Sequence, residues 1–80
     1  MITRYVQKKE ANKWMDKRTA GEKLTALRGK RTQSVVAKAL GISVSALSMY
    51  ERGERTPRDE VKQRMAQYYH QTVEQIFFAK

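Results

Sequence analysis

Cysteine is absent from the 80-residue sequence, and histidine occurs once. The lack of thiols excludes disulfide bonds and zinc sites built from thiolates, and with them a small disulfide-stapled secreted fold. One histidine and no cluster of carboxylates argue against a metal site, a cofactor or a catalytic centre. The longest apolar run covers only residues 76–79, too short to cross a bilayer, and the N-terminus lacks the apolar stretch of a signal peptide. We therefore expect a cytoplasmic protein without a membrane partner.

Acidic residues are also scarce, because 17 Lys and Arg stand against 8 Asp and Glu, which gives a formal net charge of +9. A charge of this size attracts polyanions such as DNA, RNA or an anionic membrane face. The excess lies in residues 1–56, whereas residues 57–80 carry four basic and three acidic groups. The polyanion-binding face is therefore expected in the first two-thirds of a single small domain.

The N-terminal segment differs from the rest of the chain in its patterning. The apolar residues of 1–18 fit neither a helical period nor a strand period, and basic residues are frequent among them. We interpret 1–18 as a basic arm, with Trp14 or Met15 packed against the domain; a frayed, solvated tail is the alternative. Residues 19–80 form the predicted domain.

Helix-capping residues divide 19–80 into five short helices. Ser and Thr side chains accept hydrogen bonds from the first backbone N–H groups of a helix, and Pro suits its first turn. The predicted N-caps are Thr19, Thr32, Ser43, Thr56 (before Pro57) and Thr72. The first four helices are predicted to end at Gly29, at Leu40 before Gly41, near Arg52 before Gly53, and near Tyr69.

Apolar residues at helical spacing predict one buried core. No stretch shows the alternation of a strand, so the predicted fold class is all-α. Phe77 and Phe78 are adjacent and cannot both face one side of a helix, so one should close the core and the other is a candidate dimer contact. The predicted core residues are Leu24, Leu27, Val36, Ala37, Leu40, Ile42, Leu47, Tyr50, Val61, Met65, Tyr68 or Tyr69, Ile76, and one of the two phenylalanines.

Residues 33–52, QSVVAKALGISVSALSMYER, have the pattern of a DNA-binding helix-turn-helix. Ala37 is small where two helices must approach each other. Gly41 suits a turn with positive φ, where a Cβ is costly. Each position has its own steric reason, and these reasons agree on one arrangement.

The chain resembles the XRE family, the phage-repressor and Cro type of helix-turn-helix regulator, over residues 21–79. The resemblance rests on Thr32-Gln33, Ala37, Leu40-Gly41-Ile42-Ser43, Leu47-Ser48, Tyr50-Glu51-Arg52-Gly53, Pro57 and the closing run 73–78. It implies a compact five-helix, lambda-repressor-like DNA-binding domain. Family members are mostly transcriptional repressors that bind palindromic operators on double-stranded DNA as homodimers. The closing run is similar to members from Gram-positive bacteria and their mobile elements.

The resemblance also assigns roles to individual residues. It places the third predicted helix in the major groove, with base contacts from Ser43, Val44, Ser45, Ser48 and Met49. None of these is an Arg that could clamp guanine or an Asn or Gln that could clamp adenine, so we expect thymine-methyl contacts and readout of operator shape. The predicted phosphate contacts are Thr32, Gln33, Arg52, Arg55 and Arg58, with Lys30, Arg31 and Lys38 ranked second. In the family, the glutamate at Glu51 pairs with the first-helix arginine, here Arg28.

The alternative functions for this basic chain are a partner-dependent DNA-binding subunit, a membrane-surface module and an RNA-binding module. Within the same fold, an antitoxin or accessory subunit of a mobile-element operon would act with a protein partner. A membrane-surface module would have a continuous basic amphipathic helix, and an RNA-binding module would expose stacking aromatics. The capped, turn-broken pattern of 32–53 argues against the first. The four tyrosines, mostly at core or helix-end positions, argue against the second. Neither a small-molecule ligand nor catalysis is indicated.

Overall fold

The computed structural model describes residues 16–78 of the chain. Its regular elements are five helices, α2 (Lys17–Arg28), α3 (Gln33–Leu40), α4 (Val44–Glu51), α5 (Asp59–Tyr69) and α6 (Val73–Phe77). The predicted all-α, five-helix fold is confirmed. The predicted contact of Trp14 or Met15 with the domain lies outside the described residues, as does most of the predicted arm.

Three helices begin at the predicted caps. The hydroxyls of Thr32, Ser43 and Thr72 each accept a hydrogen bond from a backbone N–H in the first turn of α3, α4 and α6. Gly41 has φ 72°, and the Ile42 N–H donates to the carbonyl of Ala37, which closes the end of α3. Hydrogen bonds between residues close in sequence therefore define both ends of α3 and the start of α4.

The predicted starts of two other helices are wrong. Asp16, rather than Thr19, caps α2, because its Oδ1 accepts from the N–H of Arg18 at 3.1 Å and the helix gains a turn. Pro57 is buried ahead of α5 rather than in its first turn, and the N-cap is Arg58, whose side chain makes no cap hydrogen bond. The acidic first turn of α5 compensates in part for the missing side-chain cap.

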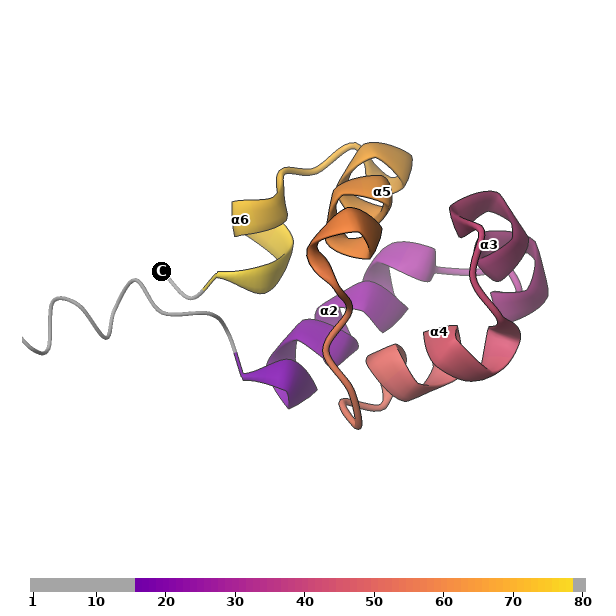
Figure 1. The fold of residues 1–80 in the computed structure, drawn as a ribbon, viewed down its shortest axis with the longest axis horizontal. Coiled ribbons are helices and arrows are strands. Elements are labelled where there is room, and N and C mark those ends of the chain that lie inside the picture. Colours follow the sequence, from indigo (N-terminus) through magenta and orange to yellow (C-terminus); the bar gives the residue numbers. More distant parts are fainter. Residues whose placement is uncertain (1–15, 79–80) are drawn as a thin grey trace, which may run out of the picture.

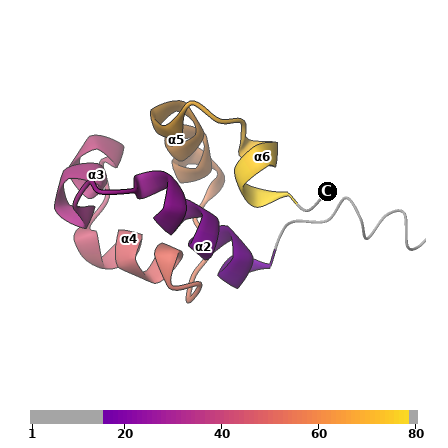
Figure 2. The ribbon, with the colours of Figure 1, turned by 180° about the vertical axis from the view of Figure 1, so that it is seen from behind.

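The helices pack in a ring of neighbours around one core. Contacts join α2 to α4 and α6, α3 to α4 and α5, and α5 to α6. Figures 1 and 2 show α3 and α4 together at one end of the molecule and α6 at the other, with α2 running between them. The largest fully buried side chains come from every helix: Leu24, Val36, Leu40, Leu47, Met65 and Ile76. The inner faces of α3 and α4 therefore pack against the core.

The predicted core is confirmed apart from a few residues at its edge. Leu27 and Ile42 are only partly buried and pack against the core from outside. In each of the two predicted pairs one residue is buried, Tyr69 and Phe77, whereas Tyr68 and Phe78 are partly buried. Phe77 is 2% exposed and closes the core, as expected for one of the two adjacent phenylalanines. The role of Phe78 as a dimer contact stays a prediction.

Candidate nucleic-acid interface

The outer face of α4 forms a shallow depression. It is lined by four of the five residues predicted to contact bases, Val44, Ser45, Ser48 and Met49, with Gln33 and Arg52 beside them. Val44 is 45% exposed although it is a large apolar residue. The fifth predicted residue, Ser43, is exposed, and its Oγ accepts from the N–H of Ala46 at 3.0 Å. This face can contact an external partner without any change in the core.

A buried polar network joins the other side of α4 to α2 and α3. Nε of Arg28 donates to Oε2 of Glu51 at 2.8 Å, and Nε2 of Gln33 donates to Oε1 of the same carboxylate at 2.9 Å. The Glu51 side chain is 4% exposed, and the Arg28 side chain is 19% exposed. The hydrogen bond to Glu51 raises the pKa of Arg28 above its ordinary value. The network fixes the end of α4 to the end of α2 and the start of α3.

Backbone contact between α2 and α4 strengthens this attachment. A Cβ on Gly21 would lie 2.5 Å from the carbonyl oxygen of Glu51 and 2.7 Å from that of Tyr50. Only glycine permits so close an approach. Gly21 was not singled out from the sequence, because its place in a helix interior carries no local signal.

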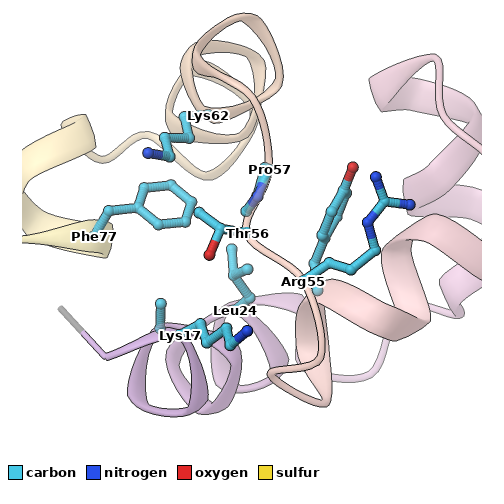
Figure 3. A pocket seen from close by; sticks show the side chains of 9 residues that line it. Lys17, Leu24, Arg55, Thr56, Pro57, Lys62 and Phe77 are labelled. Atoms are coloured by element: carbon cyan, nitrogen blue, oxygen red, sulfur yellow. The ribbon is translucent and has the colours of Figure 1, made fainter. Parts of the chain in front are cut away.

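Of the residues predicted as phosphate contacts, Gln33 and Arg52 line the depression, whereas Arg55 lines a second hollow beside the segment after α4. Thr32 and Lys38 are exposed at the start and in the last turn of α3, and Gln33 is held by Glu51 through its amide nitrogen. Arg55 and Arg58 are exposed in the segment that follows α4. In Figure 3 the Arg55 side chain extends away from Phe77.

Arg31, a second-rank phosphate candidate, has other partners. It donates to the carbonyls of Leu27 and Arg28 at 2.9 and 3.2 Å, and its guanidinium lies 5.2 Å from the ring centroid of Tyr68 and 5.5 Å from that of Tyr69. These contacts satisfy the last carbonyls of α2 and close its connection to α3. Lys30 is exposed beside it.

Arg52 is engaged with two neighbours on the surface. Its Nε and Nη2 donate to the two carboxylate oxygens of Glu54 at 2.9 and 3.1 Å, and its Nη1 donates to Oγ of Ser48 at 2.6 Å. The hydrogen bond between the pair raises the pKa of Arg52 and lowers the pKa of Glu54. A residue predicted to contact phosphate is thus in contact with one predicted to contact a base.

A second hollow, of about 240 Å³, is lined in part by residues 55–57 of the segment after α4. Its walls come from α2, α4, that segment, α5 and α6, and its lining includes Leu24, Pro57 and Phe77 (Figure 3). Lys62 reaches it with a largely buried side chain, whose Nζ lies 5.5 Å from the Phe77 ring centroid and 3.9 Å from Oδ1 of Asp59. This buried lysine was not predicted from the sequence.

Neither a metal cluster nor a membrane span is found in the described part of the chain. Within residues 16–78, His, Asp and Glu side chains do not gather in threes as a metal ion requires. No helix there is long and apolar enough to cross a membrane.

Comparison with known proteins identifies a family and several similar solved structures. Residues 24–76 match the family model described as helix-turn-helix. The SOS-response transcriptional repressor LexA from Eubacterium rectale is 24% identical with a TM-score of 0.75, over 81% of this chain and 71% of that one. The clp gene regulator ClgR from Corynebacterium glutamicum is 22% identical with a TM-score of 0.69, over 78% of this chain and 68% of that one. At these identities the similarity to the two solved structures shows the fold alone. The search of curated proteins found no match to the sequence.

Proposed function

The chain belongs to the helix-turn-helix family of DNA-binding regulators, in its XRE branch, and from this premise we propose that it is a repressor that reads a palindromic operator. As a homodimer it inserts one α4 per half-site into the major groove, with half-sites about 34 Å apart on one face of the duplex. Binding over a promoter would block transcription, and the site of action is the cytoplasm.

The exposed face of α4 is the observation that carries this proposal. Val44, Ser45, Ser48 and Met49 line one depression and are not needed to fill the core. An α-helix fits the major groove of B-DNA, where base edges can be reached. A partner surface that is convex, polar and regular suits this shallow face better than a small molecule does.

The residue types on this face define the expected readout. Val44 and Met49 would contact thymine methyl groups, and the hydroxyls of Ser45 and Ser48 can donate to or accept from several bases. Each of these contacts should discriminate by about 1 kcal/mol, the weak end of the usual range. Part of the specificity must then come from the shape and deformability of the operator.

Affinity comes largely from phosphate contacts. Thr32 and Gln33 present the N-terminus of α3, where backbone N–H groups favour an anion, and Lys38 adds a cation from the last turn of the same helix. Arg55 and Arg58 are exposed in the segment after α4 and supply two further cations. The two groups would contact phosphates on either side of the groove that α4 enters.

A binding titration on the intergenic duplex beside the chain's own gene tests the proposal. It should be run at about 150 mM salt with excess random-sequence competitor, because bare affinity would report only the charge. Binding that survives the competitor, with a palindromic footprint, is the expected result. Complete loss to competitor would refute operator reading and favour a subunit that needs a protein partner, such as an antitoxin.

A paired variant tests the phosphate contacts separately. Replacing both Arg55 and Arg58 by Ala should weaken binding to all duplexes alike. It should also lower the slope of log K against log salt by about 0.9 for each phosphate that is no longer neutralised. Arg58 makes no side-chain cap bond to α5, so its removal leaves the helix cap intact. Replacing the exposed Gln63 by Ala is the matched control.

A further inference from the structure

Arg52 is held in a defined position at the end of the DNA-facing helix. Gly53, at φ 76°, reverses the chain so that the N–H of Glu54 donates to the carbonyl of Met49 at 2.9 Å. The Glu54 carboxylate thereby comes alongside the guanidinium and accepts from its Nε and Nη2. Ser48, one turn earlier on α4, accepts from Nη1. The guanidinium is therefore anchored on the same depression as Val44, Ser45 and Met49.

The remaining donors of Arg52 point to a particular kind of acceptor. A guanidinium carries five N–H groups, and three are used here, one each on Nε, Nη2 and Nη1. One N–H remains on each terminal nitrogen. Two donors at this spacing match the O6 and N7 acceptors on the major-groove edge of guanine, and they also match two phosphate oxygens.

The charge of Glu54 distinguishes these two acceptors. Paired with Glu54, Arg52 brings no net charge to the interface, and the carboxylate would repel a phosphate placed beside it. A guanine edge is neutral and gains from two directed hydrogen bonds without that repulsion. The carboxylate also keeps the long side chain in one orientation, which lowers the entropy lost when the base is bound.

We propose that Arg52 reads a guanine in the operator and that Glu54 is the positioning residue that holds it over the recognition helix. This inference rests on the proposed DNA-binding function and deepens it, because it names a base. It replaces the sequence-based assignment of Arg52 to phosphate, and it supplies the guanine clamp that the predicted base contacts lacked. The operator half-site then contains a G·C pair facing the C-terminal end of α4.

Two readouts on the same operator duplex test the inference. The first is base preference, measured by competition with duplexes in which each G·C pair is changed to A·T or each guanine to 7-deazaguanine, which lacks the N7 acceptor. The second is the salt slope of log K. The chain with Arg52→Ala and Glu54→Gln together, which keeps the net charge of the pair, should lose a preference of about tenfold at one G·C pair while its salt slope stays unchanged. Arg55→Ala is the matched control and should lower the slope while every base preference is kept.

Glu54→Gln tests the positioning role. It should reduce the preference at the same G·C pair and strengthen binding to random duplex, because a negative charge is removed from the interface. Arg52 and Glu54 are both exposed, so the variants should unfold at the temperature of the parent chain. That check separates loss of readout from loss of fold.

Three results would contradict the role of Arg52, the role of Glu54 or the proposed function, respectively. A lower salt slope with unchanged base preference in the double variant would return Arg52 to the phosphate contacts and overturn the inference. An unchanged preference in Glu54→Gln would remove Glu54 from the readout. If the parent chain itself prefers no operator over competitor, the proposed function fails at that earlier step, before any variant is compared.

Discussion

Removing Arg28 should destabilise the fold by breaking the buried network at Glu51. In Arg28→Ala the Glu51 carboxylate, 4% exposed, loses the guanidinium that binds it at 2.8 Å. Removing one partner of a buried ion pair costs about 3–5 kcal/mol, because a charge is left buried without compensation. Gln33 still donates to the carboxylate, and water can reach the vacated side, since the Arg28 side chain is 19% exposed. We therefore expect the low end of the range, about 3 kcal/mol.

The free energy of unfolding, measured by urea titration with far-ultraviolet circular dichroism, checks this value. Lys30→Ala, an exposed lysine two residues away, is the matched control and should change stability by less than about 0.5 kcal/mol. A second variant with Arg28→Met and Glu51→Leu together should recover most of the loss, because apolar side chains of similar volume replace buried pairs at little cost. A loss below about 1 kcal/mol in Arg28→Ala would mean that the pair behaves as a solvated surface bridge, and the reasoning would be refuted.

Tyr69, Gly21 and Val44 each give a further prediction. Oη of Tyr69 is buried without a hydrogen-bond partner among the described residues, so Tyr69→Phe should be neutral or stabilising at pH 7. Burial raises the pKa of Tyr69 to about 12, so the tyrosine ionises first in the unfolded chain, and the free energy of unfolding falls as the pH rises from about 10 to about 12. Urea titrations in this pH range should show a smaller fall for Tyr69→Phe than for the control Tyr68→Phe. Equal falls in the two variants would refute the assignment to Tyr69. Gly21→Ala should cost about 1–3 kcal/mol, since its Cβ would overlap the backbone of α4, while the exposed control Glu22→Ala should cost little by the same urea titration. Replacing a contacted thymine by uracil, which lacks the methyl group, should weaken operator binding by up to about 0.8 kcal/mol in a competition titration. In Val44→Ala this loss should disappear at one thymine. If the loss persists at every thymine, Val44 does not contact a base.

The backbone of the helix-turn-helix was predictable because its determinants are local. Thr32, Gly41 and Ser43 act on the residues next to them, and α3 runs over the predicted residues. The start of α2 was not predictable in this way, because Asp16 and Thr19 both suit an N-cap. The start of α5 depends on the burial of Pro57 between helices distant in sequence.

The candidate site likewise has a part that sequence pattern predicts and a part that it does not. Helical spacing was enough to gather Val44, Ser45, Ser48 and Met49 on one face. The contact between Arg52 and Glu54 depends on the turn at Gly53, and so it was missed although all three residues are adjacent in the sequence. Side-chain partners across a turn require the backbone path, which pattern alone does not supply.

The two faces of α4 have separate roles, and this separation determines how the preferred operator of the chain can change during evolution. Leu47, Tyr50 and Glu51 hold the helix against the core, whereas Val44 and Ser45 contribute little to it. Substitutions on the outer face should therefore alter the preferred operator with little effect on folding. A gene duplicate could acquire a new regulon through a few outer-face changes, and a library randomised at these positions should remain largely folded.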